Sequence, residues 1–300
     1  MLNFRPLLPE DTPLLRMYLD RTPDLSCEFS PSCLIMWGQA QIAECEGFLV
    51  PLVTYGDFRC YLRPIGGSDF VHILPHLIED SRERGIPFRM NGITAPVRAY
   101  LEQTQNFIYT TNRDYYDYVF RVETLASLSG RKLQAKRNHI NRFVSEHPNW
   151  ISEPITRENL PECRAMTEIW YENHYANGSK PEDFAGERKA IAIAFDNFDT
   201  FGFDGLLIRD EGRVIAFSMG MPLNATTFDV NFEKAYAAID GAYAIINREF
   251  SRMVQQKYPH ILYLDREDDM GLEGLRKAKL SYNPEILLEK FSALLPEDAQ

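Results

Sequence analysis

The sequence predicts an α/β protein of two consecutive halves, each with a mixed sheet flanked by helices. Its 300 residues suffice for one large domain or for two of roughly 150 residues. A hydrophobic content of 45% and a charged content of 25% are those of a folded globular chain. Segments with helical spacing of apolar residues alternate with short strand-like segments. We therefore expect an N-terminal domain over residues 1–125 and a C-terminal domain over 126–300.

The first half contains both kinds of segment. The elements expected there are, in order, a helix opened by residues 9–13, strands over 48–53 and 58–62, a helix over 69–84, a strand over 88–90 and a helix over 94–104. Gly85 is expected to end the helix over 69–84, because glycine readily adopts the left-handed conformation found at helix ends.

The second half follows the same plan more clearly. Its expected elements are a strand over 115–120, a basic helix after Gly130, helices over 157–177 and 181–195, a hairpin over 205–220, a strand over 226–233, a helix over 241–256, a strand over 261–264, a helix over 271–280 and a strand over 286–291. Asp240 is expected to be the N-cap of the helix over 241–256, since aspartate accepts hydrogen bonds from the first helical N–H groups.

Composition excludes several classes of protein. A formal net charge of −11 argues against non-specific binding to DNA. No apolar stretch approaches the ~20 residues of a membrane span, and the amino terminus lacks the apolar core of a signal peptide. Five cysteines without a C-x-x-C pair indicate reduced, mostly buried thiols in a cytoplasmic protein. The acidic run over 265–269 could hold Mg²⁺, but it is more typical of a solvated helix cap, so no metal site is expected.

A basic run stands out in this acidic chain. Residues 131–142 hold three Arg and two Lys and no acid. A local group of cations on an acidic protein indicates an anionic ligand. The candidate binding residues are Arg131, Lys132, Lys136 and Arg137. On a helix, Ile140 and Phe143 are expected to face a core, and Arg131, Lys132 and Arg137 are expected to be exposed. The alternative is an ordinary solvated helix face.

The strand over 226–233 carries the candidate chemistry. Strict alternation places Asp229, Asn231 and Glu233 on one face of this strand, opposite its aromatic and aliphatic residues. A carboxylate can accept a proton during a reaction, and neighbouring polar groups can orient the reactants. Glu233 is the candidate base or contact to an acceptor amine, with Asp229 and Asn231 as substrate-binding residues. The alternative is that all three lie on the solvent side of an edge strand.

Element order and particular segments together point to a family. The second half has the order of a GNAT-type N-acyltransferase fold, and the first half follows it more loosely. The segments that carry the likeness are 128–143, 232–235, 240–250 and 271–280, with Ser26-x-x-Phe29 and Leu34-x-x-Trp37. They resemble the family named for the C-terminal domain of phosphatidylglycerol lysyltransferase, a domain of unknown function when it occurs alone. The resemblance covers nearly the full chain.

The resemblance implies a tandem GNAT architecture related to Fem-type peptidyltransferases and to the soluble domain of lipid aminoacyltransferases. Those relatives move an amino acid from aminoacyl-tRNA to an amine or a lipid hydroxyl. By likeness, this chain is expected to be a soluble aminoacyl- or acyltransferase that uses aminoacyl-tRNA as donor and an amine, a peptide or a lipid as acceptor. No separate cofactor is expected.

Two lysines take their expected roles from the same resemblance. In the relatives an equivalent Lys or Arg neutralises phosphate or a developing oxyanion, which makes Lys277 a candidate catalytic residue and Lys279 a candidate binding residue. The alternative is that both simply favour the negative end of a helix dipole, which contributes ~0.3–1 kcal/mol.

The chain also departs from GNAT enzymes that use acetyl-CoA. It lacks the R-x-x-G-x-G/A loop that holds pyrophosphate, and the segment 234–241 contains a single glycine next to Asp240, whose charge repels phosphate. No tyrosine matches the usual general acid, because Lys277 stands near its place. Acetyl-CoA is therefore the less favoured donor. The alternatives left open are an acetyl-CoA-dependent N-acetyltransferase and a non-catalytic module that binds an anionic ligand.

Overall fold

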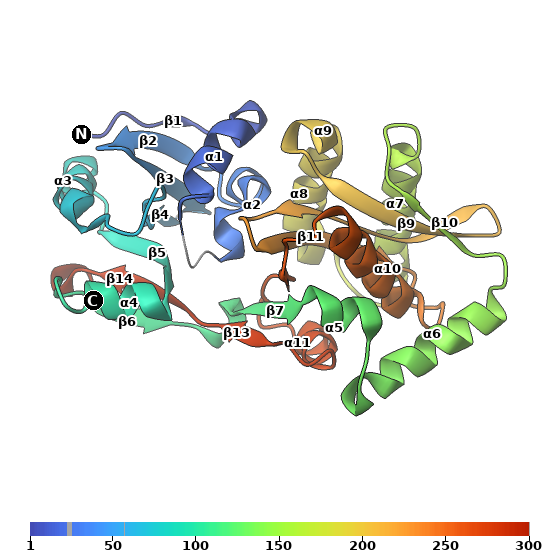
Figure 1. Ribbon diagram of the computed structural model, residues 1–300. Coiled ribbons are helices and arrows are strands. Elements are labelled where there is room, and N and C mark those ends of the chain that lie inside the picture. The colour runs from blue at the N-terminus through green and yellow to red at the C-terminus, as the bar shows by residue number, and fades with distance from the viewer. Residues whose placement is uncertain (23–25, 57, 300) are drawn as a thin grey trace. The chain divides into compact units, whose positions relative to one another are not determined.

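The computed structural model describes residues 1–22, 26–56 and 58–299 and divides into two compact units (Figure 1). The first unit holds Met1–Asp117 with Asp268–Glu273 and Leu287–Gln300, and the second holds Tyr118–Glu267 with Gly274–Ile286. These units differ from the expected ranges of 1–125 and 126–300, because the C-terminal end of the chain returns to the first unit. The expected GNAT-like domain boundaries stay a prediction.

A seven-stranded mixed sheet forms the centre of the first unit. Its strands, in sheet order, are β1 (Arg5–Pro6), β2 (Gln41–Cys45), β3 (Phe48–Tyr55), β4 (Phe58–Leu62), β5 (Arg89–Thr94), β14 (Lys290–Leu294) and β6 (Ile108–Thr111). β4 and β5 are parallel, and the other neighbours are antiparallel. The last strand of the chain therefore lies inside the sheet of the first unit.

The helices of the first unit lie around this sheet (Figure 1). They are η1 (Pro9–Asp11), α1 (Thr12–Leu19), η2 (Cys27–Phe29), α2 (Pro31–Met36), η3 (Val71–Ile73), α3 (Leu74–Arg84), α4 (Ala95–Leu101), η4 (Arg113–Tyr115) and η7 (Pro296–Asp298). The helix expected over 69–84 is confirmed as η3 and α3, and Gly85 ends it with a φ of 67°. Phe70, Leu74 and Leu77 belong to one buried core cluster with Met90 of β5, as their helical spacing predicts.

A second seven-stranded sheet forms the centre of the second unit. Its strands, in sheet order, are β13 (Ile286–Leu288), β7 (Asp117–Arg121), β12 (Tyr263–Asp265), β11 (Thr227–Ala235), β10 (Arg213–Pro222), β9 (Asp204–Asp210) and β8 (Ile151–Pro154). β11 and β12 are parallel, and α10 (Ala242–Lys257) forms the crossover that parallel strands require. The expected hairpin over 205–220 is confirmed as β9 and β10.

The other helices of this region are α5 (Val122–Ser127), η5 (Arg131–Leu133), α6 (Gln134–Glu146), α7 (Leu160–Ala176), η6 (Pro181–Phe184), α8 (Ala185–Asp196), α9 (Phe198–Phe201) and α11 (Glu273–Leu280). The core of the second unit joins the apolar face of α10 to the sheet, for example through Ile246 and Phe250 against Phe228. This packing holds α10 over β10 and β11, where the candidate site lies.

Two expectations at element ends are wrong. The single strand expected over 286–291 is divided into β13 and β14, which belong to different sheets. Asp240 is not the N-cap of α10, because Gly241 takes that position with a φ of 84° and the carboxylate of Asp240 instead binds His139 and Arg142. The five cysteines are free and buried, as their number and spacing predict.

Candidate functional site

The parallel strands β11 and β12 part within the sheet of the second unit. Their register runs only from Thr227 opposite Tyr263 to Asp229 opposite Asp265. Beyond it, β11 continues beside β10 to Ala235, while the chain after β12 stays with β7. The N–H of Arg266 donates to the carbonyl of Tyr118 at 3.0 Å, and the N–H of Tyr118 donates to the carbonyl of Glu267 at 3.1 Å. Side chains rather than backbone hydrogen bonds therefore bridge β11 to the segment after β12.

A β-bulge lies at the same level of β11. The register with β10 shifts between Met219 and Met221, which lie opposite Phe232 and Asp229. The bulge brings the two backbones so close that a Cβ on Gly220 would lie 2.0 Å from the carbonyl oxygen of Asp229, so only glycine fits there. The strict alternation expected over 226–233 is thus interrupted, since a bulge adds a residue to one strand.

Glu233 lies beyond the bulge and is held by two side chains. Its Oε1 forms an ion pair with Nη2 of Arg266 at 2.7 Å, and its Oε2 accepts a hydrogen bond from Nδ2 of Asn247 at 3.2 Å. Ser218 of β10 lies directly opposite Glu233 in the register. The side chains of Glu233 and Arg266 are only 11% and 12% exposed. The alternative that Glu233 sits on a solvated edge is therefore wrong for this residue, because β11 is a central strand.

Lys136 and Tyr282 complete this group. The ammonium of Lys136 lies 3.9 Å from the centroid of the Tyr282 ring, and the guanidinium of Arg266 lies 5.2 Å from the same centroid. Burial lowers the pKa of Lys136, and the charge of Arg266 lowers it further, while Glu233 acts in the opposite direction. Burial also raises the pKa of Tyr282 above its ordinary value. We call these residues, Ser218, Glu233, Asn247, Arg266, Lys136 and Tyr282, the Glu233 cluster.

Several polar atoms of the Glu233 cluster are buried without a hydrogen-bond partner among the described residues. They are Oγ of Ser218, Oδ1 of Asn247 and Nη1 of Arg266. Buried polar groups in proteins are almost always paired, and leaving one unpaired costs about 1–3 kcal/mol. A hydroxyl, an amide oxygen and a guanidinium N–H next to a carboxylate can together hold a small polar ligand. This arrangement makes the Glu233 cluster the candidate site.

The other two predicted residues of β11 belong to a neighbouring network. Nδ2 of Asn231 donates to Oδ2 of Asp229 at 2.7 Å and to Oε1 of Glu267 at 3.1 Å. Asp229 is fully buried, whereas Asn231 is half-buried. Asn231 therefore also bridges β11 to the segment after β12. It lies nearer along β11 than Glu233 does to Asp229, where the backbone pairing with β12 ends.

The basic run over 131–142 does not form one stripe. Arg131 and Lys132 are exposed, whereas Lys136 is half-buried in the Glu233 cluster. Arg137, expected to be exposed, is half-buried and donates to the carbonyls of Leu128 and Gly130, the latter at 2.7 Å. That expectation is wrong because the arginine closes the loop that precedes α6. Only part of the run is therefore presented to solvent.

The two lysines of α11 have different surroundings. Lys277 is exposed, and in the described part of the chain its ammonium has no ion pair or hydrogen bond. Lys279 is 8% exposed and donates to the carbonyl oxygens of Arg266 at 2.6 Å and Glu267 at 3.3 Å. Lys279 thus holds the backbone that carries Arg266. The catalytic role expected for Lys277 stays a prediction.

The start of α10 is covered by α6. Asp240 forms ion pairs with His139 at 2.7 Å and with Arg142 at 3.1 Å. A Cβ on Gly241 would lie 2.5 Å from the carbonyl oxygen of His139 and 2.9 Å from Cβ of Phe143. The backbone of α6 therefore packs directly on the first residues of α10, where GNAT enzymes that use acetyl-CoA are expected to hold pyrophosphate.

Sequence reasoning missed Ser218, Asn247, Arg266 and Tyr282 as members of the cluster. Asn247 lies within the segment 240–250 that carries the family likeness, and its polarity on the buried face of α10 is a signal that could have identified it. Arg266 is the one cation in the acidic run over 265–269. Ser218 and Tyr282 carry no such signal, because only the strand register and the chain's return after α11 place them.

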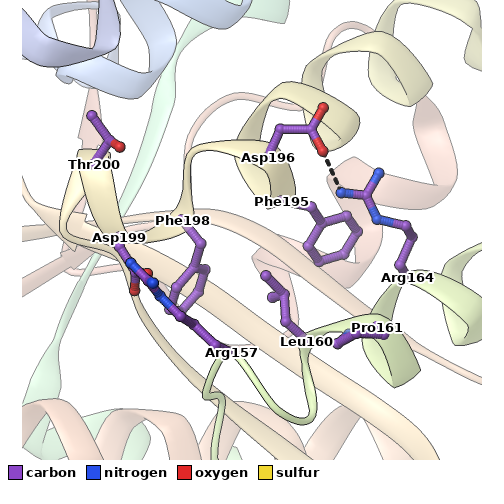
Figure 2. Close-up of a pocket in the computed structure, with 9 residues that line it drawn as sticks. All are labelled: Arg157, Leu160, Pro161, Arg164, Phe195, Asp196, Phe198, Asp199 and Thr200. Carbon is purple, nitrogen blue, oxygen red and sulfur yellow. Dashed lines mark hydrogen bonds and ion pairs between the residues drawn. The ribbon is translucent and has the colours of Figure 1, made fainter.

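A surface pocket of about 310 Å³ lies elsewhere in the second unit, between α7 and the α8–α9 segment (Figure 2). Two ion pairs, Arg157 with Asp199 and Arg164 with Asp196, lie around apolar side chains that include Phe195 (Figure 2). None of the residues predicted from the sequence lines this pocket. We therefore place the candidate site at the Glu233 cluster.

The fold and the site first define a class of protein. Two mixed sheets flanked by helices, with parallel strands β11 and β12 joined by a crossover helix, make a mixed α/β fold, and the C-terminal domain of a lysylphosphatidylglycerol synthetase and FemX share it. Within this class, the chain belongs to the family described as "Phosphatidylglycerol lysyltransferase, C-terminal", whose model matches residues 21–294. The family resemblance and the fold class predicted from the sequence are both confirmed.

Solved structures agree with this assignment. A conserved protein of unknown function from Bacteroides thetaiotaomicron is 37% identical, with 98% of this chain and 100% of that chain covered and a TM-score of 0.92. The C-terminal domain of a protein assigned as a lysylphosphatidylglycerol synthetase from Agrobacterium fabrum is 12% identical, with 97% and 93% covered and a TM-score of 0.69. FemX is 9% identical, with 99% and 98% covered and a TM-score of 0.59. At such low identity the last two show the fold alone.

An uncharacterized protein from Mycoplasmoides gallisepticum is 24% identical over 191 residues, which are 63% of this chain. The match spans 56% of that protein, so the chain corresponds to little more than half of its length. Across the described residues, no helix combines the length and the apolar character needed to cross a membrane.

Proposed function

We propose that the chain is an aminoacyl- or acyltransferase that reacts at the Glu233 cluster, with aminoacyl-tRNA as donor and an amine or a lipid hydroxyl as acceptor. The observation that carries this proposal is the group of buried polar atoms around Glu233. Oγ of Ser218, Oδ1 of Asn247 and Nη1 of Arg266 lack partners among the described residues. Acyl transfer uses such fixed groups to orient the reactants and to stabilise the negative charge that develops on the carbonyl oxygen.

In the proposed reaction, the nitrogen or oxygen of the acceptor attacks the ester carbonyl carbon of the donor. A new bond forms to that carbon, and the ester bond to the ribose oxygen breaks. The acceptor proton passes to the carboxylate of Glu233 and then to the released ribose oxygen. The hydroxyl of Ser218 is the donor available to the carbonyl oxygen during the attack.

Two further observations support aminoacyl-tRNA as the donor. Membership of the family named for phosphatidylglycerol lysyltransferase supports aminoacyl chemistry. Arg131 and Lys132 are exposed cations that suit the phosphates of a nucleic acid. An acetyl-CoA donor is less well supported, since α6 covers the start of α10 and Asp240 adds a carboxylate there.

A second candidate is a binding module without catalysis. It is favoured by the way both oxygens of Glu233 are already held by Arg266 and Asn247, as in a structural ion pair. The two candidates differ in one respect that can be measured. A structural ion pair stabilises the fold, whereas a reacting carboxylate changes the rate of transfer.

The test is transfer of radiolabelled amino acids from a charged total tRNA pool to phosphatidylglycerol vesicles, a diamine or a short peptide. Glu233→Gln is expected to lower the rate about 10²–10⁴-fold, the usual contribution of a positioned acid or base. Glu172→Gln on α7, which changes an exposed carboxylate, is the matched control and should leave the rate unchanged. Unchanged transfer by the Glu233→Gln variant, or turnover with acetyl-CoA alone, would overturn the proposal.

A further inference from the structure

Lys136 carries a positive charge in the Glu233 cluster, and no carboxylate of the described residues forms an ion pair with it. Its ammonium contacts the face of the Tyr282 ring at 3.9 Å. Among the residues that the structure describes, no acid lies within ion-pair distance of it, and Glu233 acts on it only from further away. A half-buried cation without a counterion is unusual, because charges in protein interiors are normally paired.

Arg266 brings a second cation to the same place. Its guanidinium lies 5.2 Å from the centroid of the Tyr282 ring, so both cations approach one aromatic side chain. Nη2 of Arg266 is used by Glu233, but Nη1 is buried without a partner in the described chain. The single carboxylate is thus neutralised by Arg266, and the charge of Lys136 remains in excess.

We infer that Lys136 and Arg266 form a subsite for one anionic oxygen group of the ligand, a carboxylate or a phosphate, and that this subsite disfavours a cationic group such as a lysyl ammonium. The inference rests on the proposed function and deepens it by defining the ligand chemistry of the same site. The Lys136 ammonium and Nη1 of Arg266 would both donate to the anion.

The pKa of Lys136 supports this assignment. Burial and the nearby Arg266 both lower it, which means that the charged ammonium is less stable here than in water. A bound anion would stabilise that ammonium, whereas a bound cation would destabilise it further. The same two cations would therefore discriminate between ligands of opposite charge and similar size.

The experiment compares matched small probes by isothermal titration calorimetry at constant ionic strength. Succinate and 1,4-diaminobutane have the same number of carbons and opposite charges, and inorganic phosphate is the third probe. Binding of succinate or phosphate without binding of the diamine is expected. Preference for succinate would identify a carboxylate group and preference for phosphate a phosphate group. Diamine binding as tight as that of either anion, or no anion binding, would overturn the inference.

Variants locate the subsite within the chain. Lys136→Met should weaken anion binding by about tenfold or more, the value of one charge-assisted hydrogen bond. Lys189→Met, which changes an exposed lysine of α8, should change anion binding by less than about twofold. Lys136→Arg should restore most of the affinity. Equal effects of the Lys136 and Lys189 variants would refute the assignment, and Lys136→Gln provides a second test if the methionine variant folds poorly.

This result is independent of the transfer assay. Anion binding is measured without turnover, so an inactive protein that binds succinate through Lys136 would refute the proposed function and leave the subsite standing. A protein that transfers amino acids but binds the diamine better than the anions would refute the subsite and leave the proposed function standing.

Discussion

Lys290 is buried in the first unit among acidic groups. Its Nζ lies 2.8 Å from Oδ1 of Asp117 and 3.9 Å from carboxylate oxygens of Glu28 and Asp268, with Sγ of Cys27 at 3.8 Å. Burial by itself lowers the pKa of Lys290, but Asp117, followed by the thiol and the other carboxylates, raises it well above its ordinary value. The ammonium therefore stays charged and holds the fully buried Asp117 in place.

Replacing this lysine should destabilise the protein strongly. Lys290→Met leaves Asp117 as a buried charge without its cation, so we expect the free energy of unfolding to fall by about 3–5 kcal/mol in urea titrations. Arg82→Met is the control, because the pair of Arg82 with Glu297 is 67% and 58% exposed, and it should cost at most about 1 kcal/mol. Similar losses in the two variants would contradict this account of Lys290.

Lys234 shows the opposite behaviour in the second unit. It is 3% exposed, its Nζ lies 2.7 Å from Oε1 of Glu187, and the centroid of the Trp170 ring lies 3.5 Å away. Burial lowers its pKa from the ordinary value of 10.5, and Glu187 opposes that effect only in part. The folded state therefore binds this proton less tightly than the unfolded state does.

The lowered pKa of Lys234 makes the stability of the protein depend on pH. Its contribution to stability is fully present above pH 10.5, the pKa in the unfolded state, and is lost as the pH falls through the lower pKa of the folded state. The free energy of unfolding of the natural protein, relative to Lys234→Met, should thus rise as the pH is raised from neutrality toward 10.5. Urea titrations across this range test it, with the exposed Lys132→Met as control. A flat or falling difference would be inconsistent with the lowered pKa.

At the scale of elements, the β-bulge between β10 and β11 decides where the candidate site lies. The bulge lies between Asp229 and Phe232 of β11, where the pairing with β10 shifts, and Glu233 is the next residue after Phe232. Bulges often occur beside functional sites, because they change the direction of the side chains that follow. The close contact at Gly220 is the part of this bulge that a substitution can test.

Gly220→Ala should disturb the bulge. Its Cβ would lie 2.0 Å from the carbonyl oxygen of Asp229, so β10 and β11 must move apart, and we expect a loss of about 1–3 kcal/mol in the free energy of unfolding. Gly274→Ala in α11 is the matched control, because its Cβ would meet no atom within 4 Å and alanine favours a helix by about 0.5–1 kcal/mol. Equal stability of the Gly220 variant and the natural protein would show that the bulge is not tightly packed.

Helix α6 shows how one element can combine several roles. Ile140 and Phe143 pack in the core, as their spacing predicts, and Lys136 reaches the Glu233 cluster. Arg142 and His139 instead bind Asp240 at the start of α10. The element thus contributes to the core, to the candidate site and to the cover of α10, and its charges cannot be treated as one patch.

At the scale of the whole molecule, the proposed tRNA donor makes a prediction about salt. If Arg131 and Lys132 each contact one tRNA phosphate, as proposed, Arg131→Ala combined with Lys132→Ala should lower the slope of log affinity against log salt by about one to two units. The measurement is tRNA binding by fluorescence anisotropy over a range of salt concentrations.

The control for this experiment is Arg137→Ala. Arg137 already donates hydrogen bonds to the carbonyls of Leu128 and Gly130, so its replacement should lower the stability of the protein and leave the salt slope unchanged. A slope that changes with Arg137 but not with Arg131 and Lys132 would move the contact from the exposed end of the run to the loop before α6. Salt-independent binding would argue against a phosphate contact altogether.

The amino-acid sequence by itself determined the class of fold and the family. Helical spacing and strand-like segments are local properties, so α3, the β9–β10 hairpin and α10 could be placed from them. Glu233 could be selected as a candidate in the same way, as an acid on a strand. Its role as a base still stays a prediction.

Tertiary structure alone decided what surrounds Glu233. Arg266, Asn247 and Ser218 come from three different elements, and only the strand register and the α10 crossover bring them to one place. The same holds for Lys277 and Lys279, two residues apart on α11: a helix turns about 200° between them, so one faces solvent and the other is buried against the backbone of Arg266. Which of the two lysines faces inward depends on contacts with residues distant in sequence. A local sequence pattern carries no information about those contacts.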